Sequence, residues 1–199
     1  MKAMKKISIL LVALMIFGAT SYGQSRFSKV SWEIGFPTGD LKEFLVNEDI
    51  SLGGISFDYR RMVKDNITVG GNISWAFFNG SSREDLIDGT TTISGLRQFY
   101  VNTLPIMVNA HYYRDIGDSQ IYFGTGLGGV WTLQRTDIGS YFTDNDNFQF
   151  GIMPEIGFNI PFSFTSNVNI SAKYNIALAS GNSIDYTYFT VGVGWSSWW

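Results

Sequence analysis

The sequence predicts an all-β protein, an eight-stranded antiparallel up-and-down transmembrane β-barrel. Segments of about ten residues alternate between large apolar side chains and small or polar ones. The small, weakly polar face would make a poor water-exposed surface but suits a narrow lumen. Long and short connections also alternate along the chain, as they do in barrels that cross a membrane.

The predicted strands cover residues 29–36, 54–60, 67–77, 103–112, 121–133, 148–159, 168–176 and 188–199. Alternate residues of a strand share a face, because successive side chains point to opposite sides. The predicted lipid-facing residues are, in chain order, Val30, Trp32, Ile34, Phe36; Ile55, Phe57, Tyr59; Ile67, Val69, Ile73, Trp75, Phe77; Leu104, Ile106, Val108, Ala110, Tyr112; Ile121, Phe123, Leu127, Trp131, Leu133; Phe148, Phe150, Ile152, Ile156, Phe158; Val168, Ile170, Tyr174, Ile176; and Phe189, Val191, Val193, Trp195, Trp199. The opposing faces hold mainly glycine, serine, threonine and asparagine, which a narrow lumen can accommodate.

The fourth strand carries a local exception at Pro105. Proline has no amide hydrogen and cannot donate to a ladder in the middle of a sheet. We therefore expect a β-bulge near Pro105.

The connections predict the orientation of the barrel. Long ones fall near residues 39–50, 79–95, 136–147 and 179–185, and short ones near 63–66, 114–119 and 162–165. Outer-membrane barrels have short periplasmic turns and longer extracellular loops, so both termini of the barrel are expected on the periplasmic side.

Residues 1–23 are expected to be a cleaved signal peptide, leaving residues 24–199 as the outer-membrane β-barrel domain. Basic residues precede the apolar run 7–17, and small residues follow it. Cleavage after Gly23 is preferred, and cleavage after Ser21 is the alternative. A membrane anchor is disfavoured because the apolar run is much shorter than the roughly 20 residues a helix needs to cross a bilayer.

Composition excludes several functional classes. The chain has no cysteine, which rules out disulfides, thiolate metal sites and a lipid-modified amino-terminal cysteine. The signal segment holds three lysines and no acidic residue, so its removal changes the formal net charge from −3 to −6. An acidic domain is a poor nucleic-acid binder, and no nucleic-acid partner is expected.

No catalytic, cofactor-binding or metal site is expected, and the protein is not predicted to be an enzyme. The single histidine, His111, has no nucleophile at a recognisable spacing. A lipid-modifying barrel enzyme would have to depend on His111, and this remains the least favoured alternative.

Four sequence features carry a resemblance to a known family: Phe36-Pro37-Thr38-Gly39-Asp40, Leu104-Pro105-Ile106, the glycine-rich stretch 124–129, and the terminal Trp199. In these features the chain resembles the outer membrane protein β-barrel domain family, the eight-stranded porin-like and OmpA-like barrels of Gram-negative bacteria. The resemblance implies residence in the cell outer membrane. The expected partners are outer-membrane lipid and, during biogenesis, the outer-membrane assembly machinery, and the protein is expected to be a monomer.

The last strand resembles the signal that this machinery reads. Its apolar face ends in an aromatic residue, although Ser197 interrupts the apolar row. The residues assigned to this C-terminal assembly signal are Phe189, Val191, Val193, Trp195 and Trp199.

Six charged residues fall on the predicted lumen faces, three of each sign: Lys29, Glu33, Asp58, Arg60, Glu155 and Lys173. Such a balance indicates a structural cluster whose charges neutralise one another, and a proton or ion path is the alternative. A three-residue turn at residues 163–165 would place Glu155 opposite Lys173, where an ion pair is expected.

The long connections are rich in acidic residues, which divalent cations could bridge to anionic lipid. Within one of them, Asp144-Asn145-Asp146-Asn147 offers alternating oxygen ligands but lacks the glycine and distal glutamate of a calcium loop. Solvated acidic loops are the preferred interpretation.

The favoured function is a structural or interaction role in the outer membrane, with a lumen largely filled by side chains. The alternative is a narrow pore or carrier for small solutes, since eight strands enclose room for their own side chains or one small ligand.

We expect the mature protein to require detergent, to refold into it, and to migrate differently on a gel when unheated. A closed barrel has no free edge from which to melt. Comparing gel migration with and without boiling tests this, and solubility without detergent would contradict the membrane assignment.

Overall fold

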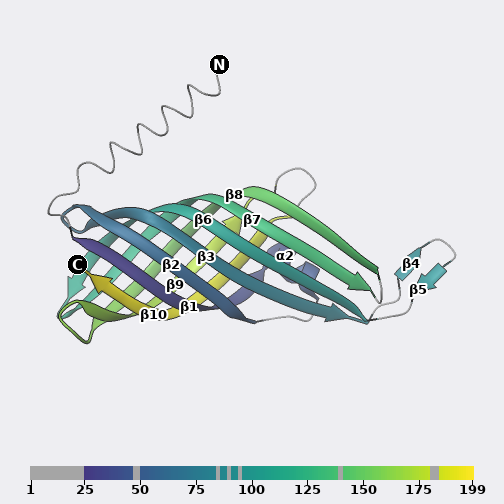
Figure 1. Cartoon of the computed structure of the whole chain (residues 1–199), viewed down its shortest axis with the longest axis horizontal. Helices are drawn as coiled ribbons and strands as arrows, with labels where there is room; N and C mark the ends of the chain where they lie inside the picture. Colours follow the sequence, from purple (N-terminus) through teal and green to yellow (C-terminus); the bar gives the residue numbers. More distant parts are fainter. Residues whose placement is uncertain are drawn as a thin grey trace, which may run out of the picture.

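The computed structural model describes residues 25–46, 50–83, 86–88, 91–93, 96–138, 141–179 and 184–199. The predicted signal peptide, and the choice between its two cleavage sites, lie outside these residues. Eight strands form a closed antiparallel barrel in the order β1-β10-β9-β8-β7-β6-β3-β2 (Figure 1). They are β1 (Arg26–Thr38), β2 (Ser51–Lys64), β3 (Ile67–Ser82), β6 (Arg97–Ile116), β7 (Ser119–Ile138), β8 (Tyr141–Pro161), β9 (Ser166–Ala177) and β10 (Tyr186–Trp198).

The predicted fold class and strand count are confirmed. The first and last strands close the sheet through a continuous register from Phe27 opposite Trp198 to Thr38 opposite Thr187. Beyond this ladder, the Arg26 amide donates to the Trp199 carbonyl at 2.6 Å, and the Trp199 amide donates back to Arg26 at 2.9 Å. No helix in the described part of the chain is long and apolar enough to cross a bilayer.

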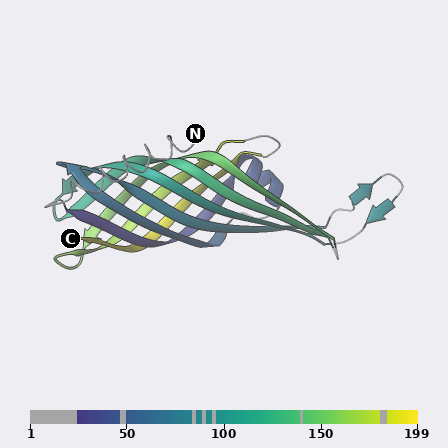
Figure 2. The ribbon, with the colours of Figure 1, turned by 45° about the horizontal axis from the view of Figure 1, so that its top comes forward.

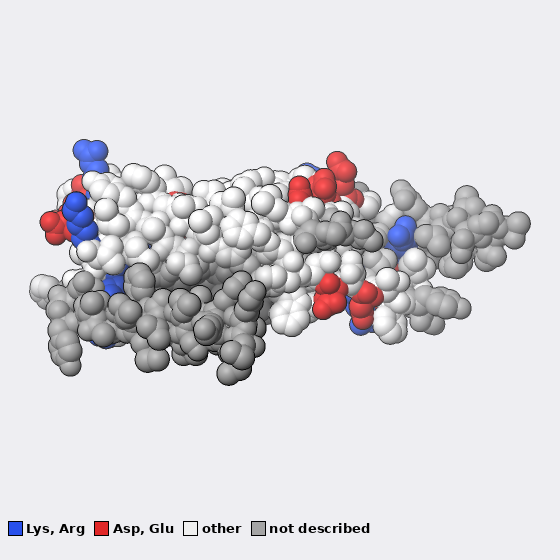
Figure 3. Space-filling model, turned by 90° about the horizontal axis from the view of Figure 1, so that it is seen from above, with Lys and Arg blue, Asp and Glu red and all other residues white. Residues whose placement is uncertain are grey.

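The assignment of faces is also confirmed. Outward side chains such as Trp32, Phe57 and Ile156 are more than half exposed, whereas the polar residues between them are buried inside the barrel. On the face seen in Figure 3, the uncovered middle of the barrel is almost entirely without charged atoms, and charges gather toward its two ends. The barrel therefore presents a lipid-compatible belt of outward apolar residues.

The three short connections lie where the sequence predicts them. The β2–β3 and β6–β7 turns contain Asn66 and Gly117 with φ of 67° and 61°, the left-handed conformation that tight hairpin turns require. Between β8 and β9 the Phe162 amide donates to the Ser166 carbonyl at 3.1 Å, which fixes the predicted three-residue turn. These turns lie at the same end of the barrel as the start of β1 and the C-terminus (Figures 1 and 2).

Two predictions about the strands and their connections are wrong. Pro105 pairs with Val130 without a bulge, and on its other side the pairs Ile73–Ile106 and Ala76–Thr103 keep one register. The missing amide thus interrupts the β3–β6 ladder locally without shifting the side-chain alternation. The register shifts occur instead on β2, opposite Glu33 to Gly35, and between Met62 and Lys64.

The predicted long connection at 136–147 is the second error. β7 continues to Ile138 and β8 begins at Tyr141, so most of this segment is strand. The segment carries Asp137, Asp144 and Asp146, and outward charges are unfavourable against acyl chains. The strands tolerate them because they extend past the apolar belt.

Strand lengths make the barrel asymmetric. β6, β7 and β8 have 20, 20 and 21 residues, whereas β9 has 12 and β1 and β10 have 13 each. The outward residues of β8 are apolar from Phe158 back to Phe148, a stretch about long enough to cross a bilayer. Beyond Phe148, toward the start of β8, the outward residues are Asp146 and Asp144. The ends of β3, β6, β7 and β8 extend past the other strands and form a wall, here called the projecting wall (Figure 2). Because this wall continues beyond the apolar belt, it stands above the membrane.

The first long connection contains a short helix, α2 (Gly39–Leu45), which the sequence analysis did not predict. Leu41 and Leu45 are completely buried. A side chain at Gly80 would overlap the Leu45 carbonyl, so the glycine permits the end of the helix to lie against β3. The second long connection carries a small hairpin, β4 (Leu86–Asp88) paired with β5 (Thr91–Ile93).

Replacing Ile156 with Arg should destabilise the refolded barrel by about 2 to 4 kcal/mol, because the charge would face acyl chains within the apolar belt. Urea unfolding in lipid vesicles measures the loss. Ser81→Arg is the matched control, since Ser81 is an exposed residue of the projecting wall. Equal losses for the two variants would show that the apolar belt does not lie at Ile156.

Candidate functional site: the filled interior of the barrel

The interior of the barrel is filled in three layers. The layer nearest the short turns is aromatic and consists of Phe27, Tyr113, Tyr122 and Trp198. Tyr113 stacks on Tyr122 with ring centroids 5.1 Å apart, and Trp198 packs against Phe27 at 5.0 Å. These rings close the lumen at the end where the short turns lie.

Above the rings lies a layer of charges that contains all six predicted lumen residues. Lys29, Glu33, Asp58, Arg60, Glu155 and Lys173 are each at most 4% exposed. Lys29 and Asp58 face each other on neighbouring strands, with Nζ and Oδ2 3.1 Å apart. The Arg60 guanidinium bonds Asp58 at 2.9 Å and also packs over the Tyr122 ring at 5.0 Å. The structure thus brings the predicted cluster together and joins it to the aromatic layer.

Glu155 on β8 is the centre of this network. Its Oε1 accepts hydrogen bonds from Lys29 Nζ at 2.6 Å and from Tyr122 Oη at 2.9 Å. Its Oε2 accepts one from Arg60 Nη2 at 2.8 Å and lies 3.0 Å from His111 Nε2. The four partners come from β1, β7, β2 and β6, so one carboxylate links five strands across the lumen.

The prediction of an ion pair between Glu155 and Lys173 is wrong. The register is as predicted, with Glu155 opposite Lys173. The Lys173 ammonium, however, lies 2.6 Å from Glu33 Oε1 on β1 and 2.6 Å from Ser56 Oγ on β2. The cause is competition inside a narrow lumen: Lys29 and Arg60 occupy Glu155, and Glu33 is a less crowded acceptor for Lys173.

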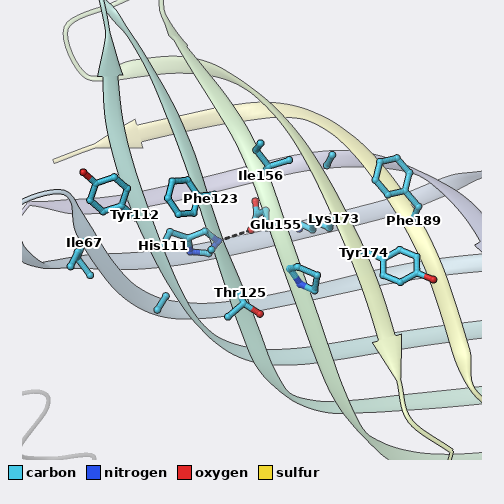
Figure 4. Close-up of a pocket in the computed structure, with 14 residues that line it drawn as sticks. Ile67, His111, Tyr112, Phe123, Thr125, Glu155, Ile156, Lys173, Tyr174 and Phe189 are labelled. Atoms are coloured by element: carbon cyan, nitrogen blue, oxygen red, sulfur yellow. Dashed lines mark hydrogen bonds and ion pairs between the residues drawn. The ribbon is translucent and has the colours of Figure 1, made fainter.

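His111 belongs to the same layer and is 2% exposed. Figure 4 shows its ring directed at Glu155, with Lys173 beyond, while Tyr112, Phe123 and Ile156 point away to the outside. Gly124 allows this placement, because a Cβ there would overlap the imidazole ring. The sequence placed His111 on the lumen face but could not show its contact with Glu155, which lies two strands away.

The third layer is apolar and fills the end of the lumen that faces the long connections. Leu41 and Leu45 of α2 pack there with inward residues of the strands, among them Phe78, Val101 and Tyr188. Tyr188 also exchanges a hydrogen bond with Thr103, with 3.0 Å between the hydroxyls. The sequence analysis missed this layer. Its one available signal was the placement of Leu41 and Leu45 four residues apart, on one face of a helical turn.

The predicted assembly-signal residues lie together on the lipid side of β10. Val193 and Trp195 are about half exposed, and Phe189 is 36% exposed. Trp199 follows the strand and carries the Arg26 guanidinium 5.1 Å from its ring. Their recognition during assembly remains a prediction.

The fold and this interior define a class: a membrane-spanning β-barrel whose lumen is filled by its own side chains. The sequence matches the family described as outer membrane protein beta-barrel domain over residues 9–196. The chain therefore belongs to the outer membrane protein beta-barrel domain family, and its location is the outer membrane. No curated protein matches the sequence.

Solved structures show the same fold at low sequence identity. OprG from Pseudomonas aeruginosa has a TM-score of 0.56 at 14% identity, and the match covers 88% of this chain and 96% of OprG. The attachment invasion locus protein Ail of Yersinia pestis has a TM-score of 0.55 at 9% identity, covering 88% and 99%. Neisserial surface protein A gives 0.53 at 11% identity, covering 88% and 96%.

Glu155→Gln should cost about 3 to 5 kcal/mol of unfolding free energy, because it leaves buried cations without their carboxylate. Adding Lys29→Met should recover part of this loss, since Lys29 loses its closest anion in the single variant. Equilibrium refolding of the two single variants and the double variant measures the coupling. Lys29→Met combined with Arg135→Met, far away on the projecting wall, should be additive. Additivity for Lys29 and Glu155 as well would show that their contact contributes nothing.

Proposed function

We propose that this protein has a structural or interaction role in the outer membrane and does not conduct solutes. The observation that supports this most strongly is the filling of the lumen by three successive layers. Eight strands enclose only enough space for side chains or one small ligand, and here buried side chains and α2 occupy it. The part of the molecule available to partners is then the region above the membrane.

The contacts within the charged layer favour a structural role for the barrel interior over a path for ions. Its carboxylates and cations contact one another at 2.6 to 3.1 Å, so each charge is already neutralised by its neighbours. An ion passing through would have to break several of these contacts at once. His111 is held in the same network, which supports a structural role for this residue over a catalytic one.

In planar bilayers the refolded protein should show no discrete openings. Leu41→Asp combined with Leu45→Asp should displace α2, because two carboxylates would stand in the apolar layer. This variant should also remain closed, since the charged and aromatic layers are intact. Adding Arg60→Ser and Tyr122→Ser removes side chains from both lower layers and should produce openings.

Gel migration without boiling shows whether each variant has formed a barrel. Discrete openings in the unaltered protein would contradict the proposal and support the narrow-pore alternative.

A further inference from the structure

One edge of the projecting wall has an open row of backbone groups. The last pairs between β8 and β9 are Gly151–Ala177 and a hydrogen bond from the Leu178 amide to the Phe150 carbonyl at 2.9 Å. Residues 141–149 of β8 continue beyond that point and pair without interruption with β7. The Gln149 side chain donates a hydrogen bond to the Ile184 carbonyl at 2.9 Å, and among the described residues no strand pairs with residues 142–148 from the other side. An exposed edge of this kind is a template for another strand.

The register shows which groups face the open side. The Phe150 carbonyl points toward β9, and the direction of backbone groups alternates along a strand. The constant β7–β8 register contains no bulge that would change this alternation. The N–H and C=O groups of Phe148, Asp146, Asp144 and Phe142 therefore point away from the barrel wall. The side chains of the same four residues lie on the outward face.

The edge is accessible, and from Asp146 to Phe142 it lies beyond the apolar belt, whose last outward residue on β8 is Phe148. Phe142 is 63% and Phe148 72% exposed, and the intervening residues Thr143 to Asp146 are exposed on both faces. The opposite edge of the wall, on β3, differs because α2 lies against Gly80 there. Figure 1 shows β8 as the outermost strand of the wall on its side, running past the ends of β9 and β10.

The charges on the outward face of the wall indicate which kind of strand can pair with the β8 edge. Asp137, Asp144 and Asp146 lie on the outward face of this part of the wall against one cation, Arg135, which bonds Asp137 at 2.7 Å and lies 3.9 Å from Asp144. A second copy pairing edge to edge would set Asp144 opposite Asp146 of the other molecule, or Asp144 opposite Asp144. Like charges directly opposite each other destabilise a strand pair.

We propose that the β8 edge binds an extended segment of a partner protein by strand addition. The segment carries Lys or Arg at two alternate positions, opposite Asp144 and Asp146, with an apolar residue on each side to meet Phe142 and Phe148. Backbone hydrogen bonds hold the segment, and the alternating side chains select it. This inference rests on the proposed interaction role and names the chemistry of the partner.

The probe is a fluorescent peptide whose alternate residues are, in order, Leu, Lys, Lys and Leu, with Thr at the positions between them. Its binding to the full-length mature protein in lipid nanodiscs is measured by fluorescence anisotropy. We expect saturable binding that weakens about tenfold when Glu replaces both Lys residues. N-methylation of the Leu and Lys amides, which face β8, should abolish binding. N-methylation of the Thr amides, which face away, should leave it within about twofold.

The protein variants test the same contact from the other side. Asp144→Lys combined with Asp146→Lys should reverse the preference, so that the Glu peptide binds better than the Lys peptide. Asp65→Lys combined with Asp118→Lys is the matched control, because it makes the same charge change in the turns at the opposite end. The control should keep the original preference, and gel migration verifies that both variants have folded.

Three results would overturn the inference: absence of saturable binding, equal binding of both N-methylated peptides, or cross-linking of β8 to β8 in a second copy. None of these depends on conductance. If the barrel does not conduct and does not bind the peptide, only the proposed edge site is refuted. If the barrel conducts, the proposed function is refuted.

Discussion

The hydrogen bonds between β1 and β10 join the two ends of the sheet, and in a bilayer this closure is obligatory. Acyl chains offer no hydrogen bonds, so a spanning sheet with an open edge would leave a row of unsatisfied amides and carbonyls. Once the sheet is closed, every second side chain must point into a narrow space. The contrast between large outward residues and small or polar inward ones follows from this one condition.

Closure also explains why the interior contains charges that bond across the lumen. Inward residues from β1, β2, β6, β7 and β8 converge within reach of one carboxylate, Glu155. A buried charge is tolerated when it is paired and hydrogen-bonded. The network meets that requirement by connecting opposite walls, which the backbone ladders alone do not do. The aromatic and apolar layers then fill the space on either side.

The sequence was sufficient for features that depend on local alternation: eight strands, the side each residue faces, the short turns, and the register that sets Glu155 opposite Lys173. It was insufficient where distant segments compete. Lys173 was expected to bond its neighbour Glu155, but Glu33, from the other side of the lumen, is its partner. The sequence analysis did not predict that α2 folds into the lumen, because Leu41 and Leu45 are buried by strands that are remote in sequence. The segment 136–147 was wrongly predicted to be a long connection because alternation alone does not show how far the strands extend past the membrane.

The cross-lumen contacts have a consequence for the order in which the barrel can be made. Lys29 lies in the first strand and Glu155 in the sixth strand of the barrel wall, 126 residues apart in the chain. Before the wall curls round, Lys29 keeps its contact with Asp58 on the neighbouring strand, but Glu155 has neither Lys29 nor Arg60 as a counter-charge and cannot be sheltered from lipid without cost. A half-inserted sheet is therefore electrostatically unfavourable, and insertion becomes a cooperative event in which the interior is neutralised only when the last strands arrive. Glu155 therefore raises the free energy of partly inserted intermediates relative to that of the closed barrel, which it stabilises.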